Sequence, residues 1–241
     1  MENALELHAL LVTLDPWLFA TFTDVSRELG IETHKSVDIG GVPEQLRRAK
    51  YEALVLDFDT VAETQLIVAS VRESSSNKDA LVFAVATGSA HRQQALDQGA
   101  TFIFERPFAT TEIRRALSST YDRMARGRRR YFRYAAELPV LLTLQSSGIE
   151  ISCSTINISS SGMAVAIPSP LNPGEIVDLA LTFPDSGLTV RASGTVVWDD
   201  KHGKAGLCFR TGMLTEIDGW LDRRFYKILH ERRLARLVRP R

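Results

Sequence analysis

The chain has 241 residues, of which 44% are hydrophobic and 24% are charged. This balance excludes a disordered, collagen-like or low-complexity protein, and the length fits two domains of about 100–200 residues each. The net charge is zero, but residues 1–120 carry 11 basic and 17 acidic side chains, a net charge of −6, and residues 121–241 carry 18 and 12, a net charge of +6. We therefore expect the two halves to have different partners.

The chain carries no sign of secretion or membrane insertion. No apolar run approaches the about 18 residues of a membrane helix, and Glu6 and Asp15 interrupt the first apolar stretch, unlike a signal peptide. Two cysteines, Cys153 and Cys208, are too few for a disulfide framework or a cysteine zinc site. We expect a cytoplasmic protein with reduced thiols, no metal site and no membrane contact.

The first half alternates predicted strands and helices. Asp15-Pro16, for example, is a helix N-cap followed by proline at the first helical position. The predicted strands are 8–13, 31–37, 53–57, 80–85 and 101–104, and the predicted helices are 16–29, 43–49, 64–73, 91–98 and 110–126. This order predicts an α/β fold with a doubly wound, parallel five-stranded sheet.

Several stretches of residues 8–125 resemble the receiver domain of bacterial response regulators. Asp57 ends the third predicted strand, where that family carries its phosphate-accepting aspartate, and the stretches 95–100 and 106–108 resemble those beside its fifth strand. The resemblance implies that Asp57 is a phosphoacceptor and that Thr87 is the switch hydroxyl.

The chain departs from the receiver pattern at two charged positions. The family's acidic pair, which holds Mg²⁺, is replaced by Thr13-Leu14-Asp15, and its lysine is replaced by Arg106. Asp57 is therefore either a phosphoacceptor or a remaining strand-end carboxylate in a domain kept for docking or dimerisation. The second interpretation is favoured, because phosphoryl transfer without its metal loses its main electrostatic aid.

An arginine-rich segment follows. Six arginines lie between residues 123 and 133, and Gly127 is expected to end the preceding helix. A linker, a helix end that balances its dipole and a nucleic-acid patch all fit this charge, which alone does not decide between them.

The rest of the second half reads as short strands and one helix. The predicted strands are 138–144, 150–157, 163–167, 176–183, 188–198 and 204–209, separated by turn sequences such as 172–174 and 184–187. They predict a six-stranded antiparallel β-barrel. The final helix is expected to cover one end of the barrel with an apolar stripe of Leu214, Ile217, Leu221, Phe225 and Ile228.

Two motifs in this half resemble PilZ domains. Residues 129–133, Arg-Arg-Tyr-Phe-Arg, resemble the RxxxR motif, and residues 157–162, Asn-Ile-Ser-Ser-Ser-Gly, resemble the (D/N)xSxxG motif. The stretches 194–198 and 204–209 resemble later strands of that family, so that the resemblance covers about residues 126–225. It implies a receptor for cyclic di-GMP, a bacterial second messenger.

The residues suit this ligand chemically. An arginine fork can meet the O6 and N7 acceptors of guanine, or a phosphate, with two hydrogen bonds. Asn157 and Ser159 offer polar groups to a base edge, and a glycine allows close approach of the backbone. The resemblance implies a ligand site of Arg129, Arg133, Asn157, Ser159 and Gly162, with Arg128 and Arg130 as further candidate contacts.

Each of these motif residues also has an explanation that involves no ligand. Arg129 and Arg133 can be solvated charges of a linker. Asn157 and Ser159 can belong to a turn in which side chains hydrogen-bond to the backbone, and Gly162 can be needed for a positive φ. The joint occurrence of both motifs at the family spacing favours binding over these explanations.

These features predict three segments: a receiver-like domain (1–122), an arginine-rich linker (123–135) and a PilZ β-barrel with a C-terminal helix (136–241). We expect a non-enzymatic adaptor without a cofactor that binds cyclic di-GMP and relays this by interdomain rearrangement to an unidentified protein partner through the receiver-like domain. The alternatives are a non-binding interaction scaffold, which includes a homodimer, and a regulator driven by phosphorylation of Asp57. The basic tail from Arg232 is explained by a solvated helix end as well as by nucleic-acid binding, which is not favoured.

Overall fold

The computed structural model describes residues 6–36, 38–210 and 215–238. The chain forms two compact units, one drawn from residues up to 129 and from 228 onward, and the other from residues 130–227. Each has its own β-sheet, so each is described by itself. Among the described residues, no helix combines the length and the apolar character needed to cross a membrane.

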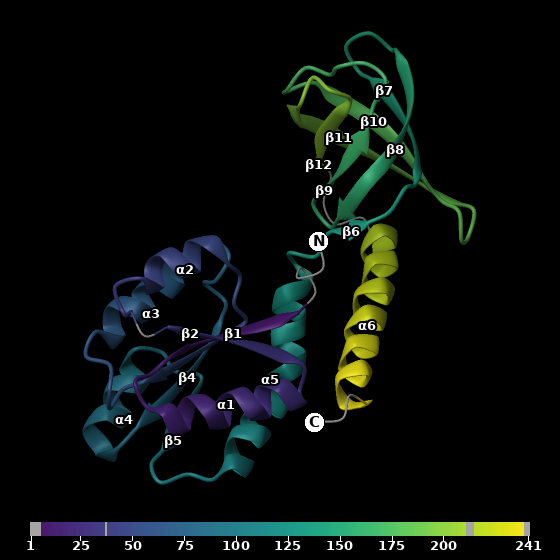
Figure 1. Cartoon of the computed structure of the whole chain (residues 1–241). Coiled ribbons are helices and arrows are strands. Elements are labelled where there is room, and N and C mark those ends of the chain that lie inside the picture. The colour runs from purple at the N-terminus through teal and green to yellow at the C-terminus, as the bar shows by residue number, and fades with distance from the viewer. Residues whose placement is uncertain (1–5, 37, 211–214, 239–241) are drawn as a thin grey trace. The chain divides into compact units, whose positions relative to one another are not determined.

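The first unit is built on a five-stranded parallel sheet with the order β2-β1-β3-β4-β5 (Figure 1). Its elements are β1 (Leu7–Val12), α1 (Pro16–Glu28), β2 (Ile31–Ser36), α2 (Val42–Arg48), β3 (Ala53–Asp57), α3 (Thr64–Glu73), β4 (Leu81–Ala86), α4 (Gly88–Asp97), β5 (Phe102–Glu105) and α5 (Thr110–Arg129). The predicted doubly wound fold is confirmed. In this strand order the chain reverses its winding between β1 and β3, and ligands of such folds bind beyond the carboxyl ends there.

The apolar runs form the central strands because helices cover both faces of the sheet. Every residue of β1, β3 and β4 is buried. The predicted start of α1 is also confirmed, since the Asp15 side chain accepts hydrogen bonds from the backbone N–H groups of Trp17 and Leu18. Gly30, with φ of +77°, follows the helix in the left-handed conformation that favours glycine.

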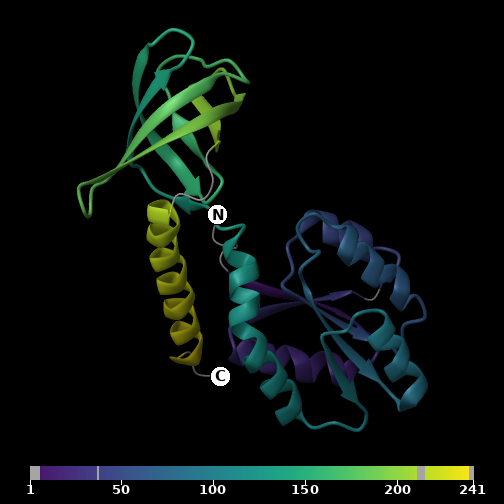
Figure 2. The same ribbon diagram turned by 180° about the vertical axis from the view of Figure 1, so that it is seen from behind.

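The second unit is an antiparallel barrel (Figures 1 and 2). Its strands are β7 (Pro139–Leu144), β8 (Glu150–Ser159), β9 (Gly162–Ala166), β10 (Ile176–Phe183), β11 (Leu188–Asp199) and β12 (Lys204–Phe209). Neighbours follow the order β8-β7-β10-β11-β12-β9, and pairing of β8 with β9 closes the ring. The six-stranded barrel predicted from the turn sequences is confirmed, and a short strand β6 (Tyr134–Ala135) that was not predicted pairs with β8.

Aromatic rings fill one end of the barrel. The ring of Phe132 lies 5.2 Å from that of Phe225 in helix α6 (Thr215–Val238), and the ring of Phe183 lies 5.0 Å from that of Trp220. Ile217, Leu221 and Phe225 of the predicted apolar stripe are buried. Ile228 is only partly buried and belongs to the first unit, so the stripe covers the barrel only as far as Phe225, and Leu214 lies outside the described residues. The first turns of α6 therefore cover this end of the barrel.

The arginine-rich segment differs from its prediction. Helix α5 runs through Gly127 to Arg129, so Gly127 does not end it. A glycine inside a helix costs about 1 kcal/mol relative to alanine, and the contacts of buried Arg128 with Glu52 and with the carbonyl oxygen of Lys50 hold the last turn. Residues 123–129 are thus helical.

Candidate functional site

A cavity on the barrel surface brings together parts of both PilZ-like motifs. It has a volume of about 240 Å³ and lies where β9, β11 and β12 are neighbours. The residues that line it include Arg133, Ser161, Gly162, Ala164, Trp198, Gly206 and Cys208. Arg133 comes from the first motif, whereas Ser161 and Gly162 come from the second.

Two glycines shape this surface by close approach. A Cβ atom on Gly162 would lie 2.1 Å from the carbonyl oxygen of Leu207, and a Cβ on Gly206 would lie 2.1 Å from the indole nitrogen of Trp198. Gly162 is not among the glycines with positive φ, so its backbone conformation does not require glycine. Gly162 instead lets β9 lie close to β12, and Gly206 leaves space for the indole of Trp198.

Trp198 is a site residue that the sequence motifs did not indicate. It is 44% exposed although it is a large aromatic side chain. The register of β11 shifts between Val196 and Trp198, and such irregularities re-aim side chains at functional surfaces. The signal in the sequence was weak, because a tryptophan at a strand end also fits a barrel core.

The polar residues of the second motif have two different environments. The Ser159 hydroxyl donates a hydrogen bond of 3.0 Å to the carbonyl oxygen of Gly162, within the β8–β9 turn. The Asn157 Oδ1 atom is buried and accepts no hydrogen bond from any residue that the structure describes. An unsatisfied buried acceptor costs about 1–3 kcal/mol. Ser159 thus follows the turn explanation, whereas the Asn157 acceptor is left unsatisfied, and neither residue lines the cavity.

The arginines of the first motif also differ. Arg133 is exposed and lines the cavity, whereas Arg128 and Arg129 are buried, with 6% and 8% of their surface exposed. Arg128 lies 3.6 Å from Glu52 and donates a hydrogen bond to the carbonyl oxygen of Lys50. Arg128 therefore stabilises the first unit. Because its guanidinium is already engaged there, Arg128 is a poorer candidate for a ligand contact. Arg130 is exposed to solvent, and it also interacts with other residues of the chain.

The two cysteines have different accessibility. Burial raises the pKa of the Cys153 thiol to about 11, so this thiol stays protonated at neutral pH. Cys208 is exposed and lines the cavity.

The first unit carries a second cluster at the carboxyl ends of its strands. The Arg106 Nη2 atom lies 3.0 Å from Asp15 Oδ2 and 3.2 Å from Asp57 Oδ2, and the Arg106 Nε atom lies 3.3 Å from Asp59 Oδ2. A single guanidinium thus contacts all three carboxylates from within the protein. Asp15 is the remaining acid of the receiver pattern, and its Oδ1 atom caps helix α1.

Asp59 was not indicated by the sequence. It accepts hydrogen bonds from the backbone and hydroxyl of Thr87 and lies 2.7 Å from His91 Nδ1. Burial acts to raise the pKa of Asp59, but these hydrogen bonds and the charge of Arg106 outweigh it, so the pKa is lower than usual. The hydroxyl of Thr87, the residue matched to the receiver switch, is therefore bonded to an ionised carboxylate.

Asp57 is enclosed by its neighbours. Its side chain has no exposed surface. Its Oδ2 atom accepts hydrogen bonds of 2.8 Å from the hydroxyls of Thr13 and Thr60, and its Oδ1 atom accepts one from the backbone N–H of Asp59. Both oxygens are engaged, in contrast to what a phosphoryl acceptor requires.

We predict that Asp57 does not accept a phosphoryl group. Incubation of the chain with acetyl phosphate and Mg²⁺ should leave its intact mass unchanged, because Arg106 already bonds to the carboxylates of Asp15 and Asp57 that a metal would need, and the attacking oxygen is buried. A mass increase of one phosphoryl group that is absent from Asp57→Asn would contradict this prediction.

Comparison with known proteins supports the assignment of the second half. Residues 127–223 match the family described as PilZ domain, which confirms the resemblance noted in the sequence. No curated protein matches the chain.

Solved structures resemble each half separately. The receiver domain of the sensor histidine kinase PA1611 from Pseudomonas aeruginosa PAO1 is 20% identical, with 47% of this chain and 96% of that chain covered and a TM-score of 0.43. The PilZ domain of CeSA from a cellulose-synthesizing bacterium is 17% identical, with 40% and 97% covered and a TM-score of 0.31. The Bacillus subtilis inhibitor of motility, MotI/DgrA, is 22% identical, with 39% and 50% covered and a TM-score of 0.33.

Proposed function

We propose that the chain is a signalling adaptor whose barrel binds cyclic di-GMP. The observation that carries this proposal is the cavity in which exposed Arg133 from one motif lies with Ser161 and Gly162 from the other, beside Trp198. The match of residues 127–223 to PilZ domains supports the same ligand class.

The chemistry of the cavity suits a guanine nucleotide. The exposed indole of Trp198 offers an apolar face on which a base can stack. Arg133 offers a fork for guanine O6 and N7 or for a phosphate. Asn157 does not line the cavity, so its buried Oδ1 atom would meet a guanine N–H group only if the ligand rearranges this part of β8.

The size of the cavity suggests how the ligand is held. Closed ligand sites usually have volumes of about 300–1,000 Å³, larger than the about 240 Å³ found here. The dinucleotide would therefore lie partly outside the cavity and need contacts from the segment around Arg129 and Arg130. Because α5 ends at Arg129, ordering of this segment by the ligand would act on the last turn of that helix. This is the proposed relay to a protein partner of the first unit.

A second candidate function is a scaffold that has lost ligand binding. The burial of Arg129, at 8% exposed, and the use of the Ser159 hydroxyl within its own turn favour this alternative. Under this alternative both residues stabilise the fold, and Arg133 is a solvated charge.

Calorimetric titration of the full chain with cyclic di-GMP and with cyclic di-AMP tests the proposal. We expect micromolar or tighter binding of cyclic di-GMP and at least about tenfold weaker binding of cyclic di-AMP, because adenine replaces the O6 acceptor with an amino group. If the wild-type chain gives neither heat of binding nor a change in unfolding temperature with cyclic di-GMP, the proposal is contradicted. The non-binding scaffold is then the function that remains.

A further inference from the structure

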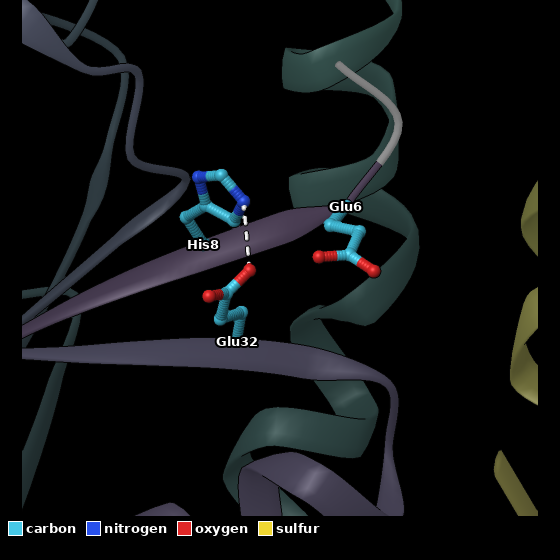
Figure 3. Close-up of side chains that lie close together, drawn as sticks. All are labelled: Glu6, His8 and Glu32. Atoms are coloured by element: carbon cyan, nitrogen blue, oxygen red, sulfur yellow. Dashed lines mark ion pairs between the residues drawn. The ribbon is translucent and has the colours of Figure 1, made fainter. Parts of the chain in front are cut away.

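A second polar cluster lies at the amino ends of β1 and β2, away from the strand ends that carry Asp57. The sequence has Glu-Leu-His at residues 6–8 and Glu-Thr-His at residues 32–34. The two strands are parallel, and their register places His8 opposite Glu32. Glu6 directly precedes β1, and the strand pairing places Glu32 beside His8. Figure 3 shows the three side chains converging.

The distances in this cluster fit those of metal ligands. One ligand atom from each of Glu6, His8 and Glu32 lies within 4.8 Å of the other two. The His8 Nε2 atom is 3.4 Å from Glu32 Oε2. Two ligands bound at about 2.1 Å to a tetrahedral metal ion lie about 3.4 Å apart. The pair already has this spacing, and Glu6 needs only a small side-chain movement to complete the set.

His8 presents the atom that a metal requires. Its side chain is 9% exposed, and Nε2 is buried without a hydrogen-bond partner among the described residues. The backbone of Lys50 lies close enough to hydrogen-bond the His8 ring. Donation from the other ring nitrogen to a carbonyl is the usual support of a metal-binding histidine.

Both glutamates also lie beside other charged side chains. Glu32 Oε1 lies 3.3 Å from His34 Nε2, and Glu6 Oε1 lies 3.6 Å from Arg232 Nη1. A carboxylate has two oxygens with several lone-pair sites, so a carboxylate that accepts from a neighbouring cation can bind a metal at the same time.

We propose that Glu6, His8 and Glu32 form a binding site for a divalent transition metal of the zinc and cobalt class. One neutral imidazole and two carboxylates suit Zn²⁺ or Co²⁺, whereas Mg²⁺ and Ca²⁺ prefer oxygen ligands alone. Three protein ligands leave a fourth tetrahedral position for water. The sequence was expected to hold no metal site because two cysteines are too few for one, and no local motif joins Glu6 and His8 to Glu32, which only strand pairing brings together.

Titration of the untagged full chain with Co²⁺, followed by visible absorption and calorimetry, tests this site. We expect one equivalent to bind with the absorption bands of tetrahedral cobalt. His8→Gln and Glu32→Gln should each weaken binding by at least about 100-fold, more than the loss of a residue that only supports a ligand. His91→Gln removes another histidine beside a carboxylate and should leave binding unchanged.

Three outcomes would overturn the metal site: no bound equivalent in the wild type, wild-type affinity in both cluster variants, or an equal loss in His91→Gln. The Glu32 side chain is 39% exposed, so we expect Glu32→Gln to keep the fold even if His8→Gln does not. The test is independent of cyclic di-GMP, because the cluster lies in the first unit and the cavity in the second.

Discussion

Arg133→Ala should reduce the affinity for cyclic di-GMP by about 100-fold while leaving the fold unchanged. Arg133 is exposed and lines the cavity, so its removal opens no gap in a core. A bidentate arginine contact to guanine is worth about 1–3 kcal/mol, and each 1.4 kcal/mol changes the dissociation constant tenfold. Calorimetry of the full-length variant measures this loss directly.

Two further variants separate the arginine fork from its charge. Arg133→Lys keeps the charge and should still bind at least about tenfold more weakly than the wild type, since an ammonium group lacks the planar fork. Arg191→Ala is the matched control: Arg191 is an exposed arginine of the same barrel that lines a different cavity, beside Glu150 and Asp178. Equal losses in Arg191→Ala and Arg133→Ala would mean that only overall charge attracts the ligand.

Arg129→Ala is a less direct test. We expect it to lower affinity as well, but Arg129 is buried at the end of α5, so its removal also changes the packing of the helix. A binding loss in this variant is interpretable only together with its unfolding temperature.

Gly162→Ala should destabilise the barrel by about 3 kcal/mol or more. The added Cβ would lie 2.1 Å from the carbonyl oxygen of Leu207, which is backbone and can yield only if β9 and β12 separate. Overpacking of this kind costs about 1–3 kcal/mol, and more where the neighbour cannot move. Thermal and denaturant unfolding of the second unit measure the change.

Gly219→Ala is the matched control for Gly162→Ala. Gly219 lies in helix α6, and its Cβ would meet only the side chain of Arg223, at 3.8 Å. It should leave the barrel unchanged or stabilise it by about 0.5–1 kcal/mol, because alanine favours the helix. An unfolding temperature of Gly162→Ala equal to that of the wild type would show that Gly162 is kept for the ligand alone.

Local patterns predicted most of the fold. The strands of both units lie where short apolar or alternating runs end in turn sequences, because burial on one or two faces fixes these patterns. The error at Gly127 has a tertiary cause. The burial of Arg128 and Arg129 holds the last helical turn, whereas the sequence shows only a glycine among charges.

The parts of the sites that the sequence missed depend on contacts between distant segments. Trp198 becomes a cavity residue only because it lies on Gly206 of the neighbouring strand. Arg106 reaches Asp15 and Asp59 only because parallel strands end at one edge of the sheet. Such contacts have no local signature, whereas the two motifs around Arg133 and Gly162 do.

The most direct test of the account is to map where cyclic di-GMP binds, by backbone amide chemical shifts of the full chain during a titration. We predict the largest changes at Ser161, Gly162, Leu207 and Cys208, which line the cavity. Smaller changes in the last turn of α5 would follow from the proposed relay. Shifts that do not change, or that change only away from the cavity, would contradict the binding site on which the account rests.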